Sequence, residues 1–120
     1  MKADVSLIGG VAAWLRWRER RKAQGKPYDK PNLVMSTAYQ VVWEKFCQLW
    51  QIEMRTVPLT KKHPTLDIEA AIAMCDENTI CIVPIAGVTW TGMNDDIEAL
   101  NNALETYNSI TGYDIPIHVD

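Results

Sequence analysis

Apolar positions along this chain of 120 residues follow two kinds of spacing. Some segments place an apolar residue at every third or fourth position, as amphipathic helices do, whereas shorter runs are wholly apolar or alternate, as strands do. We expect helices at about residues 4–24, 38–50, 67–76 and from 95 onward, and strands at 32–35, 52–59, 79–86 and 115–119. Helices and strands that alternate along a chain predict an α/β domain with a parallel sheet.

The polarity of the expected strands predicts their order in the sheet. The first and third strands are the most apolar, as central strands of a parallel sheet are. The second strand carries Glu53 and Arg55, and the fourth is short, so both belong at the edges. We therefore expect a single domain over residues 1–120, with a doubly wound, four-stranded parallel sheet in the order 2-1-3-4 and helices on both faces. A ligand crevice then lies at the carboxyl ends of the first and third strands, near residues 35–39 and 86–92.

The same spacing predicts which helical positions are buried. The inward stripe comprises Val5, Ile8, Ala12 and Leu15 in the first helix and Val42, Phe46, Leu49 and Trp50 in the second. Asp95 and Glu98 have the spacing of a capping box, so the fourth helix should begin near Asp95. Gly9 and Gly10 lack the spacing of a phosphate-binding loop, and they favour a close approach between packed elements.

Charge and composition exclude several classes of function. The formal net charge is −3, which gives no general attraction to nucleic acid or to an anionic membrane. The basic residues between positions 16 and 22 fall at the end of the first helix, where they complement its dipole, so we expect a solvated helix end. No apolar run approaches the roughly 20 residues of a membrane span.

The three cysteines, Cys47, Cys75 and Cys81, match no zinc-binding spacing, and their odd number does not suggest a disulfide framework. We therefore expect no metal site and a location in the reducing cytoplasm.

Three positions near the expected crevice are candidates for binding. Thr89 lies in a loop whose hydroxyls and backbone N–H groups could hold a small polar or anionic ligand, although an ordinary turn fits equally well. Asp120 could pair with a cationic ligand, with a merely exposed aspartate as the alternative. His118 alternates within an apolar strand, which by itself favours a structural histidine.

Seven segments then occur in a distinctive order: WRER (17–20), GKP (25–27), DKPN (29–32), QVVWEKF (40–46), CDENTI (75–80), GVTWTG (87–92) and IHVD (117–120). Together they resemble the glutamate decarboxylases, which are pyridoxal-phosphate-dependent enzymes of fold type I. The resemblance covers nearly the whole chain and concerns part of the large, cofactor-binding domain.

The resemblance implies a role for four positions. Asp120 matches the aspartate that pairs with the pyridinium nitrogen of pyridoxal phosphate. Gln40 matches the residue against the cofactor ring, Thr89 matches a threonine beside cofactor and substrate, and His118 matches the histidine two residues before the aspartate. The implied reaction is decarboxylation of L-glutamate to 4-aminobutyrate, with L-glutamate bound only by the complete enzyme.

The sequence also departs from the family pattern. The family reaches, after the aspartate, a His-Lys pair whose lysine attaches to the cofactor, and these 120 residues stop before it. Residues 1–4, Met-Lys-Ala-Asp, stand where the family usually has a Gly-Ser-Ser-Glu-like phosphate-binding stretch. Family active sites also use a second subunit. We therefore expect an inactive fragment, truncated or engineered, that does not hold the cofactor stably.

Two other classes of function remain open. One is a scaffold without catalytic function, in which exposed faces and an open sheet edge favour a homo-oligomer. The other is a small flavodoxin-like ligand binder that uses the crevice near Ser36, Thr37 and Thr89, although its first strand–helix turn has no glycine to admit a phosphate.

Overall fold

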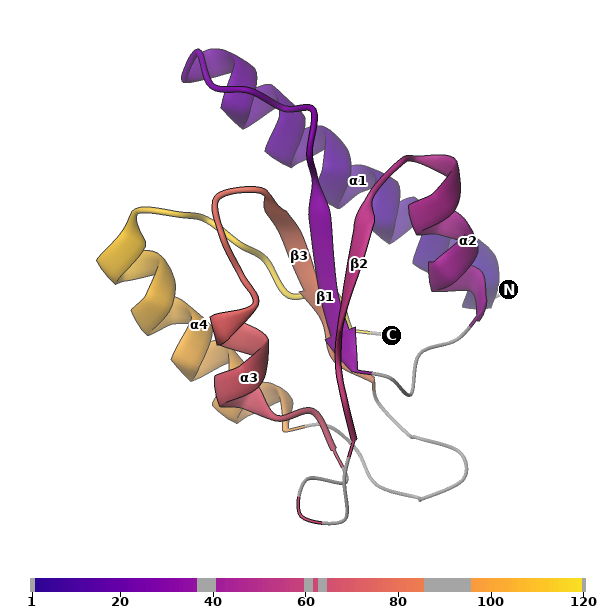
Figure 1. Cartoon of the computed structure of the whole chain (residues 1–120), viewed down its shortest axis with the longest axis vertical. Coiled ribbons are helices and arrows are strands. Elements are labelled where there is room, and N and C mark those ends of the chain that lie inside the picture. The colour runs from indigo at the N-terminus through magenta and orange to yellow at the C-terminus, as the bar shows by residue number, and fades with distance from the viewer. Residues whose placement is uncertain (1, 37–40, 60–61, 63–64, 86–95, 120) are drawn as a thin grey trace.

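The computed structural model describes residues 2–36, 41–59, 62, 65–85 and 96–119 (Figure 1). Along the chain the elements are α1 (Lys2–Ala23), β1 (Asn32–Ser36), α2 (Val41–Leu49), β2 (Glu53–Val57), α3 (Ile68–Ala73), β3 (Thr79–Val83) and α4 (Ile97–Thr111). The alternation expected from the apolar spacing is confirmed for these seven elements.

The three strands form one parallel sheet in the order β2-β1-β3. Leu33 of β1 lies opposite Met54 on one side and Cys81 on the other. Every residue of β1 and β3 is buried, as the continuous apolar runs predicted, whereas β2 is partly exposed at the edge. The α/β fold with a parallel sheet is therefore confirmed, and these strands have the expected relative order.

The expected fourth strand at residues 115–119 forms only one parallel bridge in the described part of the chain, between Ile82 and Ile117. Two groups explain why the ladder does not extend. Pro116 has no N–H to donate, and the Asn108 side chain binds both the N–H and the C=O of Ile115, each at 3.1 Å. The four-stranded order 2-1-3-4 is therefore not confirmed. The segment instead lies beside β3 through the backbone of Ile82.

Helices cover both faces of the sheet (Figure 1). Side chains of β1 alternate between the two faces, with Leu33 and Met35 in the core under α1 and α2 and Val34 in the core under α3 and α4. The second core is closed by Leu100 and Leu104 of α4. The sheet thus separates two apolar layers, and its ends are left for polar groups.

The buried stripe of α1 differs from the predicted one. Ala13, Trp17 and Arg21 are buried, whereas Leu15, which we expected to face inward, is 41% exposed. The largest side chain decides the rotation of the helix, because the Trp17 indole both fills the core and donates to the backbone oxygen of Glu77 at 3.0 Å.

Arg21 also departs from the expectation of a solvated helix end, since it is only 4% exposed. Its guanidinium donates to the backbone oxygen of Pro27 at 2.7 Å and pairs with the Glu77 carboxylate at 3.2 Å. Buried charge is tolerated when it is paired in this way. Part of the basic run therefore joins α1 to the turn before β3.

The stripe of α2 is also shifted. Trp43, Phe46 and Cys47 are buried, whereas Leu49 is 78% and Trp50 is 40% exposed, so the inward positions predicted for these last two residues are wrong. The helix ends at Leu49, and Gln51 adopts a positive φ of 55° that turns the chain toward β2. The end of α2 thus presents apolar surface to solvent.

The fourth helix begins one residue later than the Asp95–Glu98 spacing predicted. Asp96 is its N-cap, and its carboxylate accepts from the backbone N–H of Ala99 at 3.0 Å. Asp95 itself lies outside the described residues. Gly112, with φ of 78°, ends the helix in the left-handed conformation.

Candidate functional site

The carboxyl ends of the three parallel strands meet at one edge of the sheet, below the arrowheads in Figure 1. β1 ends there at Ser36 and β3 at Val83, and the start of α2 lies at the same edge because α2 follows β1. In open α/β sheets, ligands bind at this edge, where the strand order reverses about the first strand. The structure places β1 between β2 and β3, so the reversal predicted from the sequence lies beside β1.

His118 is the candidate cofactor residue that the structure describes at this edge. Its backbone N–H donates to the oxygen of Ile82 at 2.9 Å, which anchors the residue beside β3. Its imidazole meets the ring of Trp43 at a centroid separation of 5.5 Å and an angle of 63°. The ring also lies against Gly9 of α1. His118 therefore joins three elements and stays partly exposed.

The other candidate residues, Gln40, Thr89 and Asp120, lie outside the described residues, as do Thr37 and most of the expected crevice loops. Their grouping around one ligand therefore stays a prediction. Ser36, named for the alternative ligand-binding role, is described and is buried at the end of β1.

Gly9 and Gly10 form a close contact between α1 and its neighbours, as the sequence favoured. A Cβ atom built on Gly10 would lie 2.8 Å from Cζ of Phe46, and one on Gly9 would fall 2.7 Å from both ring nitrogens of His118. Both distances are too short for carbon in contact with a ring, so a side chain at either position requires the ring to move. The sequence signal was the glycine pair, but it did not identify the two aromatic partners.

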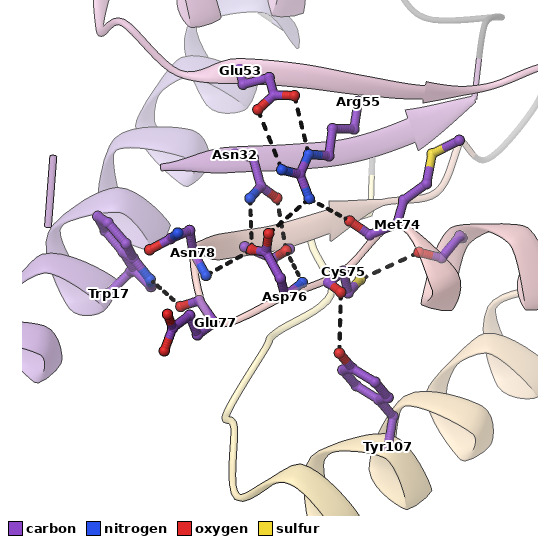
Figure 2. A network of polar contacts seen from close by, with 12 residues as sticks. Trp17, Asn32, Glu53, Arg55, Met74, Cys75, Asp76, Glu77, Asn78 and Tyr107 are labelled. Carbon is purple, nitrogen blue, oxygen red and sulfur yellow. Dashed lines mark hydrogen bonds and ion pairs between the residues drawn. The ribbon is translucent and has the colours of Figure 1, made fainter. Parts of the chain in front are cut away.

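The most extensive polar network described lies at the opposite, amino edge of the sheet (Figure 2). Asp76 is its centre. One carboxylate oxygen accepts from the Asn32 side chain at 2.9 Å and the Asn78 backbone N–H at 2.8 Å, and the other accepts from Arg55 at 2.9 Å. Burial raises the pKa of Asp76, but these hydrogen bonds and the charge of Arg55 outweigh it, so the pKa lies below its usual value.

Neighbouring groups complete this network. The Thr79 hydroxyl donates to the Asn32 side chain at 2.7 Å and accepts from the Asp76 backbone N–H at 2.9 Å. Arg55 also donates to the backbone oxygen of Met74 at 2.8 Å and pairs with Glu53 at 3.2 Å. The Glu53 hydrogen bond is the main cause that raises the pKa of Arg55.

This network is a structural device and not a site for chemistry. Asn32 starts β1, Thr79 starts β3 and Arg55 lies on β2, so the network ties the three strands together at their amino ends. Its acceptors and donors satisfy one another. The alternation of Glu53 and Arg55 in the sequence predicts an edge exposed to solvent and gives no sign of this network. The Asp-x-Asn-Thr sequence at 76–79, typical of a side-chain-stabilised turn, was the available signal.

A hollow of about 470 Å³ lies between α1 and the segment before Ile117, lined by Trp17, Arg20, Ile80 and Asp114 among others. Arg20 spans part of it, because its guanidinium donates to the backbone oxygen of Asp114 at 3.1 Å. It lies beside the outer edge of β3 and not at the strand ends.

No cluster of three or more His, Cys, Asp or Glu side chains suited to a metal occurs within the part of the chain that the structure describes. Among those same residues no helix is both long and apolar enough to cross a membrane. The three cysteines are free and buried.

The sequence of this chain is similar to those of known proteins. Residues 2–120 match the family model described as the pyridoxal-dependent decarboxylase conserved domain. The chain is 48% identical to glutamate decarboxylase beta of Listeria monocytogenes and 46% identical to glutamate decarboxylase of Lactococcus lactis subsp. cremoris, in each case over 98% of this chain and 26% of the relative. It therefore spans about a quarter of the length of these relatives.

A solved structure agrees with this match. The glutamate decarboxylase of Lactobacillus brevis superposes with a TM-score of 0.94 at 40% identity, over 99% of this chain and 27% of that one. At this TM-score, the helices and strands of the two chains are arranged in the same way.

Proposed function

The chain belongs to the pyridoxal-dependent decarboxylase family, and we propose that it forms part of the cofactor-binding domain of a glutamate decarboxylase. The observation that carries the proposal is the position of His118. Its ring is held by α1 and α2 at the carboxyl edge of the sheet, which is the edge where α/β folds bind ligands. The glutamate decarboxylases among its relatives support the choice of L-glutamate as substrate of the whole enzyme.

The described residues fit pyridoxal phosphate at this edge. The His118 imidazole is flat, partly exposed and held by aromatic and glycine neighbours, which suits a planar heteroaromatic ligand. Pyridoxal phosphate supplies an electron sink for the carbanion that decarboxylation leaves.

This chain would contribute recognition of the ring. The Asp120 carboxylate would hold a proton at the ring nitrogen, Gln40 would lie against the ring, and Thr89 would contact cofactor and substrate. Support comes from chain continuity: Gln40 directly precedes α2, which carries Trp43, and Asp120 follows two residues after His118.

We further propose that these 120 residues alone do not decarboxylate L-glutamate. Covalent attachment of the cofactor needs a positioned lysine, and no lysine of the chain follows a histidine as the family's lysine does. Purified chain incubated with L-glutamate and pyridoxal phosphate should release carbon dioxide no faster than L-glutamate and pyridoxal phosphate do without the chain. Turnover that depends on the chain would contradict this proposal.

Cofactor recognition is tested by titrating the purified chain with pyridoxal phosphate and recording absorbance. Because the chain is not expected to hold the cofactor stably, binding should be weak and reversible, and should give a saturable shift that Asp120→Ala abolishes. Asp29→Ala is the matched control, because Asp29 is an exposed aspartate just before the amino end of β1. Borohydride reduction followed by mass spectrometry should find no single preferred lysine. Absence of saturable binding, or equal binding by both variants, would refute the proposed role of Asp120 in this chain.

A second candidate is a homo-oligomeric scaffold without catalysis. The observation that favours it is apolar surface where α1 and α2 meet. The Trp14 and Trp50 rings are in tilted contact with centroids 5.0 Å apart, and their sequence neighbours Leu15 and Leu49 are exposed. Sedimentation velocity over a range of concentrations tests it. Association that Leu49→Lys removes supports this candidate, and a monomer at all concentrations contradicts it.

We also propose a cytoplasmic location. The support is chemical: Cys47, Cys75 and Cys81 are all free thiols buried in the core, which fits a protein folded in a reducing compartment. We also propose that the chain has no nucleic-acid partner, because a net charge of −3 gives no general attraction to nucleic acid.

A further inference from the structure

We propose that Gly9 is a positioning residue, whose missing side chain sets the orientation of the His118 ring at the carboxyl edge of the sheet. This inference rests on the proposed function, because the ring matters for chemistry only if pyridoxal phosphate binds at that edge. It concerns a contact between α1 and the last segment of the chain, which lie more than 100 residues apart in sequence.

The backbone of His118 is already fixed before the ring is considered. Its N–H donates to Ile82 at 2.9 Å, and the oxygen of Pro116 accepts from the N–H of Ile82 at 3.0 Å. The side-chain torsions therefore determine where the imidazole lies. Trp43 of α2 limits these torsions from one side, with its ring centroid 5.5 Å away.

Gly9 limits them from another side. A Cβ atom at Gly9 would fall 2.7 Å from both ring nitrogens of His118 and closer still to the carbon between them. The ring thus occupies the volume that any other residue at this position would fill. Replacement of Gly9 must displace His118, or α1 must move away from the sheet.

The other glycines that the structure describes show that this role is particular. Gly25 and Gly112 have positive φ values of 68° and 78°, and a Cβ atom on either would meet nothing within 4 Å. Those two glycines serve the backbone at helix ends. Gly9 and Gly10 lie inside α1, where alanine is the better helix former. Their value is therefore the space they leave, and each leaves it for a different ring.

Gly10 supplies the matched control. A Cβ atom there would lie 2.8 Å from the ring of Phe46, which belongs to the core between α1 and α2. Gly10→Ala and Gly9→Ala make the same chemical change at adjacent positions of one helix. Only Gly9→Ala should disturb His118 directly, so any general effect of alanine in α1 appears in both variants.

The first measurement is the NMR spectrum of the imidazole protons, because the chain has only two histidines. In the unmodified chain we expect a nuclear Overhauser contact between Hε1 of His118 and Hα of Gly9. Gly9→Ala should move the His118 signal, which is shifted by the nearby Trp43 ring, more than Gly10→Ala does. His63 provides the reference signal. Absence of the contact, or equal shifts in the two variants, would overturn the inference.

The second measurement is a double-mutant cycle on pyridoxal phosphate affinity, read by absorbance titration. Gly9→Ala should weaken binding about tenfold, as coupled neighbouring residues do, whereas in a His118→Ala background the same change should have little effect. An undiminished effect in that background means that Gly9 does not act through His118. If the unmodified chain binds no cofactor, the proposed recognition of the cofactor ring by this chain alone fails, and the NMR result still decides the role of Gly9.

Gly9→Ala could also prevent folding, and the double variant then gives the answer. Removing the imidazole in Gly9→Ala/His118→Ala takes away the atoms that the new methyl group meets. Recovery of the folded circular dichroism spectrum supports the inference. A double variant that stays unfolded contradicts it, because the conflict would then lie elsewhere in α1.

Discussion

Replacing Asp76 with alanine should produce a large loss of stability for a side chain that lies outside both apolar cores. The substitution removes three hydrogen bonds at once, from the Asn32 side chain, the Asn78 backbone and the Arg55 guanidinium. Asn32 is 1% exposed, so its amide group would be left without this acceptor in a place that water does not reach.

The magnitude follows from those contacts. An unsatisfied buried donor costs about 1–3 kcal/mol. The ion pair with Arg55 adds at most about 1 kcal/mol, because both side chains are partly exposed and solvent screens them. Arg55 also keeps its bonds to Met74 and Glu53. We expect a total loss of about 1–4 kcal/mol, a substantial part of the roughly 5–15 kcal/mol that holds a domain folded.

The assay is urea unfolding followed by circular dichroism at neutral pH. Asp76→Asn keeps an oxygen for Asn32 and Asn78 but loses the charge, so it should cost less than Asp76→Ala. Asp114→Ala is the control, because Asp114 also pairs with an arginine, Arg20, yet its side chain is 87% exposed. That control should change stability by less than about 0.5 kcal/mol.

Acidification gives an independent check on the same carboxylate. Because the folded state lowers the pKa of Asp76, its carboxylate stabilises the fold above the unfolded pKa of about 3.9, and this contribution is lost as pH falls through the folded pKa. The stability gap between the unmodified chain and Asp76→Asn should therefore narrow below about pH 4. A gap that stays constant, or an Asp76→Ala cost equal to that of Asp114→Ala, would refute the reasoning.

Two further results follow from the cores. Trp17→Phe removes the indole N–H that donates to Glu77 and leaves part of a fully buried volume empty. Urea unfolding should therefore show that the free energy of unfolding falls by about 1–3 kcal/mol. An unchanged free energy of unfolding would mean that other residues set the rotation of α1. Burial raises the pKa of the Cys47 and Cys75 thiols to about 12, and it also raises the pKa of Cys81. A disulfide reagent at pH 8 should therefore label none of the three thiols in the folded chain and all three in urea. Rapid labelling of the folded chain would contradict the burial of these thiols.

Elements that depend on local pattern were predictable from the sequence. Apart from Asn32 and Thr79 at their starts, residues 32–35 and 79–86 are continuous apolar runs, and such runs can satisfy both their faces only as central strands between helical layers. Their position, together with the charged β2, was enough to give the order of the three strands. The strand order alone then predicts at which edge of the sheet a ligand crevice lies.

Features that depend on one side chain meeting another were not predictable. Nothing in the spacing of α1 indicates that Trp17 and not Leu15 faces the sheet, because the choice depends on the Glu77 oxygen that receives the indole N–H. The incomplete fourth strand has the same origin, since Asn108 captures the backbone of Ile115 from a helix. Long-range polar partners override local propensity at both places.

The two edges of the sheet differ in how their polar side chains are held. At the amino edge, Asp76, Asn32 and Arg55 join all three strands through hydrogen bonds that are mutually satisfied. At the carboxyl edge, His118 is held by packing against Trp43 and Gly9, and its ring keeps exposed surface. Because the amino edge already fixes strand register, polar residues at the carboxyl edge need not stabilise the fold. Their side chains can instead be selected for ligand recognition. Under the proposed function, changes at Asp120 should therefore alter cofactor binding, whereas changes at Asp76 should alter stability.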